Sequence, residues 1–104
     1  MTELPFHRER ADAAVATPVT LAALEAFDDI LDARSPAEFA EDHLPGATSA
    51  AVLDDAERAE IGTLYKERSA FEAKRAGAPL AARNIARLIA ERFATRPRGW
   101  RPLV

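Results

Sequence analysis

Two charged residues, Asp32 and Arg34, are the side chains best placed for chemistry in this sequence. Ile30, Leu31 and Ala33 form a short apolar run around them, between acidic residues. Such a run predicts a buried strand whose C-terminal end carries the two charged side chains to the edge of a sheet. From the residues alone, an ion pair between this carboxylate and this guanidinium would stabilise the turn that follows the strand.

The sequence offers few other groups for catalysis or metal binding. It contains no cysteine, which excludes disulfides and thiolate metal sites. His43 has no second histidine or cysteine at metal-ligand spacing, so a structural role before Pro45 is favoured and no metal site is expected. His7 lies in residues 1–17, a polar, alanine-rich segment that we interpret as a loose lead-in to a domain of residues 18–104.

The elements that must position the charged pair are predicted by local signals. Ser35, Pro36 and Glu38 have the spacing of a capping box, so a helix should begin directly after the strand. Residues 44–46, Leu-Pro-Gly, should end this helix. The small residues 47–53 predict a second, parallel strand, which makes this region the front of an α/β unit.

The remaining signals predict four helices and a final strand. The residues that should start these helices are Thr20, Asp54, Ser69 and Pro79, and the last of them should begin the longest helix. The helix that starts after Ser69 should stop near Gly77. Apolar residues at helical spacing over 80–93 predict a face that packs on a sheet, and Leu103-Val104 looks like the start of a strand.

Length and composition predict one soluble domain. The chain has 104 residues, of which 48% are hydrophobic and 30% charged, and it has neither a membrane-spanning run nor a secretory signal, so the cytoplasm is the expected location. Residues 1–62 hold 4 basic and 14 acidic side chains, whereas residues 63–104 hold 10 basic and 3 acidic ones. The basic half is either a solvated helix surface or a surface for an anionic partner such as RNA.

The stretch from Asp29 to Ala47 resembles the N-terminal signature of the rhodanese family of sulfur-carrier domains. That signature is a strand followed by Asp-x-Arg-x-Pro-x-Glu-Phe-x-x-x-His-Ile-Pro-Gly-Ala, and in this sequence Leu44 replaces the isoleucine. The matching positions are Asp32, Arg34, Pro36, Glu38, Phe39, His43, Pro45, Gly46 and Ala47. The resemblance implies an α/β fold with short parallel strands flanked by helices.

Later motifs resemble one branch, the rhodanese domain of bacterial tRNA 2-selenouridine synthase. The most specific of them is the run Gly62-Thr63-Leu64-Tyr65-Lys66, because ordinary single-domain rhodaneses lack this helical insert. The other matching runs are residues 52–55, 57–58, 71–73, 82–86 and 100–104. The resemblance implies replacement of the sulfur of wobble 2-thiouridine in tRNA by selenium from selenophosphate, and also a geranylated intermediate made from geranyl diphosphate.

In that family the nucleophile is a cysteine in a loop directly after a Pro-Leu-Val strand, and a P-loop domain follows. The sequence ends at Val104, so we expect an incomplete, truncated rhodanese domain that lacks the cysteine and is inactive alone. The resemblance places Asp32 and Arg34 beside the cysteine loop, where they would orient it and favour an anionic sulfur or selenium. The alternative is a non-catalytic rhodanese-like module that binds a protein or RNA partner.

Five further residues have weaker functional interpretations. Arg83 and Asn84 match the family's Ala-Arg-Asn run; Asn84 is expected to make a buried hydrogen bond, and substrate contact is the alternative. Tyr65 and Lys66 could meet tRNA or the P-loop domain, but a tyrosine packed at the edge of the core is favoured. Trp100 is expected to cover the core edge rather than to stack on a base.

Overall fold

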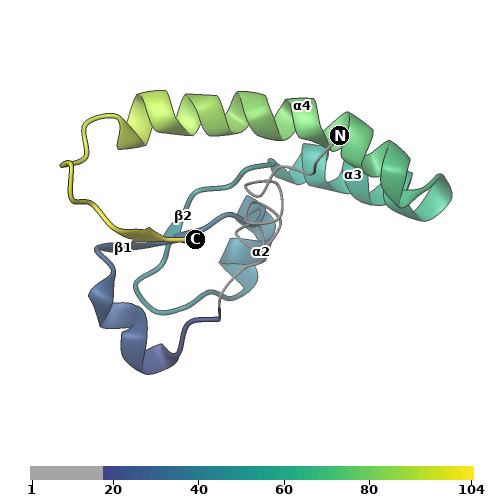
Figure 1. Ribbon diagram of the computed structural model, residues 1–104. Helices are drawn as coiled ribbons and strands as arrows, with labels where there is room; N and C mark the ends of the chain where they lie inside the picture. Colours follow the sequence, from purple (N-terminus) through teal and green to yellow (C-terminus); the bar gives the residue numbers. More distant parts are fainter. Residues whose placement is uncertain (1–17) are drawn as a thin grey trace, which may run out of the picture.

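The computed structural model describes residues 18–104 (Figure 1), so the predicted lead-in of residues 1–17, with His7, lies outside the described residues. No helix in the described part has the length and apolar composition that crossing a bilayer requires. The elements, in chain order, are η1 (Leu21–Ala26), β1 (Asp29–Asp32), α2 (Pro36–Glu41), β2 (Thr48–Ser49), α3 (Asp55–Glu67), α4 (Ala70–Leu88), η2 (Ile89–Phe93) and β3 (Pro102–Leu103).

A three-stranded parallel sheet with the order β2-β1-β3 forms the centre of the fold. Leu31 pairs with Thr48 on one side of β1, and Ile30 pairs with Leu103 on the other. Helices flank this small sheet (Figure 1), and the predicted class, α/β with short parallel strands flanked by helices, is confirmed. The first crossover, β1-α2-β2, is the predicted α/β unit.

The second strand is shorter than the predicted 47–53, because only Thr48 and Ser49 have strand geometry. The chain nevertheless stays attached to the end of β1 beyond β2. The Ala50 N–H donates to the Asp32 carbonyl at 2.9 Å, and the Val52 N–H donates to the Ala33 carbonyl at 3.1 Å. Small side chains give this segment little area to pack, so backbone hydrogen bonds hold it.

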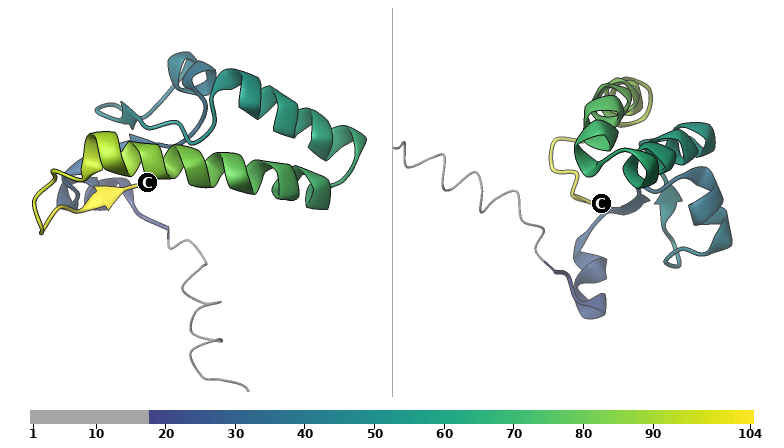
Figure 2. Two further views of the ribbon diagram at one scale, coloured as in Figure 1. Left: turned by 90° about the horizontal axis from the view of Figure 1, so that it is seen from above. Right: turned by 90° about the vertical axis from the view of Figure 1, so that its right-hand side faces the viewer.

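Helices α3 and α4 form an antiparallel hairpin that extends away from the sheet (Figure 2). Asp54 caps α3 with a full capping box, and Ser69 caps α4, as predicted. The predicted stop near Gly77 and the predicted new helix at Pro79 are wrong, because α4 runs without a break through both residues. Gly77 faces Ile61 of α3, so close packing of two helices keeps the chain helical at a residue of low helix propensity.

The N-terminal helix is also different from the prediction. Residues Leu21–Ala26 form a 3-10 helix, and the Thr20 side chain makes no capping hydrogen bond. The segment is held instead at its end, where Asp28 and Arg101 exchange two hydrogen bonds. The Asp28 N–H donates to the Arg101 carbonyl at 2.9 Å, and the Arg101 N–H donates to the Asp28 carboxylate at 2.7 Å.

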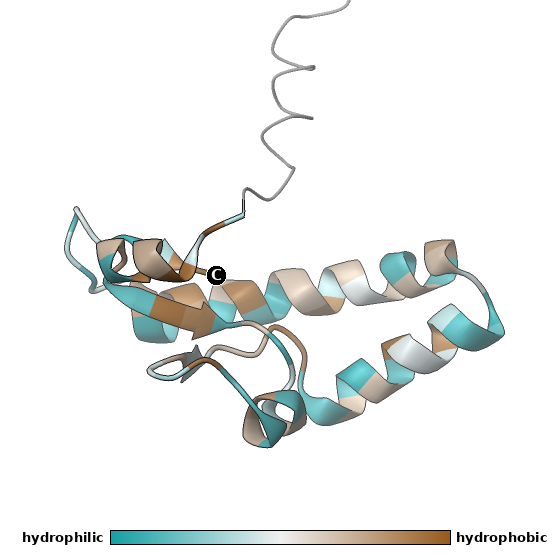
Figure 3. Cartoon of the chain, turned by 90° about the horizontal axis from the view of Figure 1, so that it is seen from below, coloured by the Kyte–Doolittle hydropathy of each residue, from teal (hydrophilic) through white to brown (hydrophobic). Residues whose placement is uncertain are grey.

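The core is small. Leu31, Ala50 and Ala73 are the buried apolar residues of the described part, and Ser35 and Asn84 are the buried polar ones. Figure 3 shows hydrophobic segments on β1 and on the part of α4 near it. The predicted apolar face of the long helix is only partly covered there, since Ile85 and Ile89 are exposed and line an apolar cavity of about 210 Å³ beside Leu31.

Candidate functional site

The end of β1 carries a doubly hydrogen-bonded ion pair between Asp32 and Arg34. The Arg34 Nε lies 3.0 Å from Asp32 Oδ1, and its Nη2 lies 2.8 Å from Oδ2. The Arg34 backbone N–H also donates to Oδ1 at 3.0 Å. The same Nη2 donates to the Asp42 carbonyl at 2.6 Å, which connects the start of α2 to its end. The pair therefore stabilises the strand-to-helix turn, as the residues alone suggested.

The electrostatics of this pair keep both groups charged. Side-chain and backbone hydrogen bonds from Arg34 lower the pKa of Asp32 below its ordinary value. The hydrogen bond to Asp32 likewise raises the pKa of Arg34. A carboxylate that is already bonded to a guanidinium and an N–H is a poor general base at neutral pH, so its chemistry is that of a fixed charge.

Ser35 locks the first turn of α2 directly behind the pair. Its hydroxyl lies 2.9 Å from the Glu38 carboxylate, and both halves of the predicted capping box are present. These contacts with Ser35 lower the pKa of Glu38. Arg58 of α3 adds an ion pair to Glu38 at 3.6 Å. Glu38 thus acts as a helix cap, as predicted.

A pocket of about 450 Å³ opens at the carboxyl ends of β1 and β3. Asp32 and Arg34 line it together with Leu103 and Val104, and its other lining residues are apolar. Val104 is 81% exposed at this point. In open parallel sheets the carboxyl ends of the strands are where ligands bind, so this edge is the candidate site.

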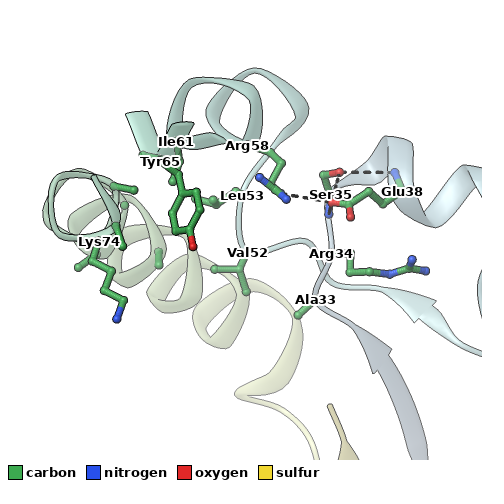
Figure 4. Close-up of a pocket in the computed structure, with 15 residues that line it drawn as sticks. Ala33, Arg34, Ser35, Glu38, Val52, Leu53, Arg58, Ile61, Tyr65 and Lys74 are labelled. Carbon is green, nitrogen blue, oxygen red and sulfur yellow. Dashed lines mark hydrogen bonds and ion pairs between the residues drawn. The ribbon is translucent and has the colours of Figure 1, made fainter. Parts of the chain in front are cut away.

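A larger pocket of about 660 Å³ lies on the other side of the same turn, between α2, α3 and α4 (Figure 4). Ala33, Arg34 and Ser35 form one wall, and small residues of α4, including Ala73 and Gly77, line the helical side. Arg58, Tyr65 and Lys74 bring polar groups to this mostly apolar space. Because Arg34 lines both pockets, the turn separates two neighbouring cavities.

Asn84 makes the predicted buried hydrogen bonds, and they join α4 to the loop before α3. Its Nδ2 donates to the Val52 carbonyl at 2.7 Å and to the Glu57 carboxylate at 3.0 Å. Its Oδ1 accepts from Arg87 at 2.8 Å. Arg83 pairs with Glu57 at 2.8 Å on the exposed side. All described bonds of this cluster are internal; whether it also contacts a substrate stays a prediction.

The other predicted site residues are distributed around the fold rather than gathered at the edge. His43 stacks on Phe39 with ring centroids 3.7 Å apart and bonds the Phe39 carbonyl, which suits a structural role. Trp100 is half-buried and donates to Asp29 at 2.6 Å, so it covers the edge of the sheet. Tyr65 is 62% exposed, and its predicted place at the core edge is wrong, because it stands in the last turn of α3, where the hairpin turns into α4.

No protein-family model matches the chain, and no solved structure matches it significantly. Short stretches do match curated proteins. A tRNA 2-selenouridine synthase of Bordetella petrii is 39% identical over 62 residues, which cover 55% of this chain and 17% of that protein. One from Nitrosomonas europaea is 42% identical over 48 residues, 46% of this chain and 12% of that protein. The chain is similar to tRNA 2-selenouridine synthases.

A third tRNA 2-selenouridine synthase, of Chromohalobacter salexigens, is 50% identical over 38 residues, or 36% of this chain. The aligned stretches span only 10% to 17% of these three relatives. The similarity is therefore local, and it supports the family that the sequence motifs indicated.

Sequence reasoning missed several residues that shape the site. In the sequence Glu57 belongs only to the matching run 57–58, yet in the structure it accepts hydrogen bonds from both Asn84 and Arg83. The one local signal for a structural role of Glu57 is its position three residues after the N-cap Asp54, which is the spacing of a capping box. Arg58 and the small residues of α4 form much of the larger pocket, but their grouping depends on the approach of two helices and has no local signal.

Proposed function

We propose that this chain is the rhodanese-type N-terminal portion of a tRNA 2-selenouridine synthase. In this reaction selenium replaces the sulfur of wobble 2-thiouridine in tRNA. The proposal rests on the local similarity to proteins of that name and on the architecture of the strand edge.

The observation that carries the proposal is the register between β1 and β3. Asp29 pairs with Pro102 and Ile30 pairs with Leu103, with the two strands parallel. Continued by two residues, this register brings the position after Val104 beside Asp32. In the family that the sequence resembles, the cysteine loop follows this Pro-Leu-Val strand. The Asp32–Arg34 pair would then lie at the edge of that loop.

The role of the pair follows from its geometry. A transferring thiolate must be nucleophilic at neutral pH, and a nearby cation favours the anionic form of sulfur or selenium. Arg34 supplies that cation, although part of its charge is neutralised by Asp32, 2.8 Å away. Asp32 holds the guanidinium in one orientation. Arg34 is thus proposed to stabilise the anion, and Asp32 to position Arg34.

The substrates and partners of the reaction are proposals as well. Selenophosphate would donate selenium, and tRNA would carry the acceptor base. Geranyl diphosphate would supply the geranyl group of the intermediate, and a P-loop domain would complete the enzyme. The described residues hold no group of three histidine, cysteine or acidic side chains suited to a metal ion, so no residue is assigned to metal binding.

Mass spectrometry of tRNA nucleosides tests the proposed reaction. The gene for the natural product is deleted from its own host, and 2-selenouridine in bulk tRNA is measured before and after the deletion. We expect 2-selenouridine to disappear and to return when the intact gene is restored. Unchanged 2-selenouridine in the deleted strain would contradict the proposal.

Two variants of the restored gene examine the site. Arg34→Gln removes the cation and is expected to reduce 2-selenouridine at least about tenfold, a common loss when one charge-stabilising group is removed. Arg98→Gln is the matched control, because Arg98 is exposed and outside the site. The intact mass of the natural product is measured in parallel and should exceed the 11.3 kDa of this chain.

A second candidate function, a binding module without catalysis, is favoured by one observation. The 104 residues contain no cysteine. A natural product with a mass of 11.3 kDa would favour this module over the transferase.

A further inference from the structure

Nine of the ten basic residues in the basic half of the chain fall into two groups, and the tenth, Arg98, is exposed and lies outside both. Five of the arginines in residues 63–104 contact other described parts of the fold. Arg83 and Arg96 form ion pairs with the carboxylates of Glu57 and Asp29. Arg87 donates a hydrogen bond to the side-chain oxygen of Asn84, and Arg92 donates one to the backbone carbonyl of Ser49. Arg101 lies over the ring of Phe27. These positive charges are thus engaged within the fold.

The second group lies at the end of the α3–α4 hairpin. Lys66, Arg68, Lys74 and Arg75 are all exposed, and none has an ion pair or side-chain hydrogen bond within the described part of the chain. They belong to residues 65–75, the hairpin tip, which includes the last turn of α3 and the first turns of α4. The tip carries four basic and two acidic side chains, so its net charge is positive.

The hairpin tip also exposes two aromatic side chains among these cations. Phe71 is 70% exposed and Tyr65 is 62% exposed. Lys74 and Arg75 follow Phe71 by three and four residues, which places them on the same side of α4. Tyr65 and Lys74 line one pocket (Figure 4). Aromatic and basic residues thus alternate along residues 65–75, and the hairpin holds those of α3 and α4 together at one end of the helix pair.

This combination fits one kind of partner. Exposed aromatic rings provide flat surfaces on which unpaired bases stack, and unpaired lysines and arginines bind the phosphates between them. We propose that the hairpin tip binds single-stranded RNA, with bases stacked on Phe71 and Tyr65 and phosphates held by the neighbouring cations. The identity of the partner as RNA rests on the proposed function.

Fluorescence anisotropy with the 104-residue protein tests the surface. The probe is a fluorescein-labelled RNA stem-loop with an unpaired loop, and a duplex of equal length is the comparison. The combined variant Lys66→Gln, Arg68→Gln, Lys74→Gln, Arg75→Gln should weaken stem-loop binding at least about tenfold and lower the salt dependence, since each lost phosphate contact reduces the slope by roughly 0.7.

Phe71→Ala separates stacking from charge. It should weaken binding of the stem-loop about tenfold and leave binding of the duplex unchanged, because duplex bases are not free to stack on a side chain. The matched controls are Leu21→Ala, which shortens another exposed apolar side chain, and Arg98→Gln, which removes an exposed arginine outside the tip. Both should bind like the wild type.

Several results would overturn the inference: no binding by the wild type, equal binding by the combined variant, or an equal loss in Arg98→Gln. Circular dichroism verifies the fold of each variant. If the combined variant is unfolded, RNA binding by the single variant Arg75→Gln is compared with RNA binding by Arg98→Gln, and equal binding would overturn the inference. RNA binding at the tip in a protein whose gene deletion leaves 2-selenouridine unchanged would refute only the proposed reaction. Loss of 2-selenouridine on deletion, with normal binding by the tip variants, would refute only this surface.

Discussion

The strand edge and the hairpin tip use the same kinds of side chain in opposite ways. At the edge, Arg34 is bonded to Asp32 through two nitrogens and to the Asp42 carbonyl, so its position is determined by the fold. At the tip, Lys74 and Arg75 are exposed and have no charged partner within the described residues. A charge bonded internally can orient a reacting group, whereas an unbonded one is available to a partner.

The two regions also differ in what holds them together. The edge depends on caps and backbone hydrogen bonds around Ser35, whereas the hairpin depends on close approach of two helices at Gly77 and Ile61. Asn84 connects the hairpin to the strand edge, since it lies on α4 and bonds the Val52 carbonyl. A substitution in one region should therefore leave the structure of the other region unchanged. A substitution of Asn84 is the exception and should affect both.

The largest expected effect is at this connection. Asn84→Ala leaves the Val52 carbonyl and Glu57 without their amide donor, which should lower the free energy of unfolding by about 2–3 kcal/mol. Urea denaturation measures the change. Arg83→Ala is the control: it removes an exposed partner of Glu57 and should cost under about 1 kcal/mol. Equal losses would contradict the special role of the buried amide.

The same substitution at two glycines should have opposite effects in the two regions. Gly46 has a φ of 82°, so Gly46→Ala should destabilise the turn after α2 by about 1–2 kcal/mol. Gly77→Ala should stabilise α4 by about 0.5–1 kcal/mol, because the new Cβ would sit 3.7 Å from Ile61, an ordinary contact distance. Thermal unfolding of both variants checks the signs; a destabilised Gly77→Ala would show that the helices cannot accept a methyl group.

Acid should weaken the ion pair at the strand edge. The folded pKa of Asp32 is lowered from its ordinary value of 3.8, so its ion pair contributes fully above that value. The contribution is lost as the pH falls through the lower folded pKa. Asp32→Asn should therefore show a smaller loss of stability between neutral and acid pH than the wild type, measured by urea denaturation across pH. An unchanged pH dependence would indicate that the pair does not support the fold.

The smallest expected effect on stability is at the tip. Phe71→Ala should change the free energy of unfolding by less than about 0.5 kcal/mol, because the ring is 70% exposed. Differential scanning calorimetry against the wild type measures it. A larger loss would mean that Phe71 packs in the folded protein, and the tip would then differ less from the edge.

Local signals were enough for the strand edge. The apolar run around Ile30 and Leu31 correctly predicted β1. The capping box at Ser35 correctly predicted the start of α2, and the Leu-Pro-Gly sequence predicted the turn after this helix. They succeeded because a cap, a proline or a glycine acts on residues within a few positions of itself. The same reasoning predicted the caps Asp54 and Ser69. The predicted buried hydrogen bond of Asn84 is also observed, but its partner Val52 lies far away in the sequence.

Local signals failed where distant contacts outweigh propensity. Gly77 and Pro79 suggested two helices, but packing against α3 makes α4 one helix of 19 residues. The exposure of Tyr65 and its position near Lys74 likewise depend on how the hairpin closes.

The sequence by itself thus determined the α/β class, the caps Ser35, Asp54 and Ser69, the Asp32–Arg34 pair and the family resemblance, since each depends on residues that are near neighbours in the chain. Only the tertiary structure decided which positive charges are bonded inside the fold and which, at the hairpin tip, have no partner among residues 18–104. The physical reason is that pairing depends on distances between residues far apart in sequence, such as the 2.8 Å between Arg83 and Glu57, and these distances exist only after the helices pack.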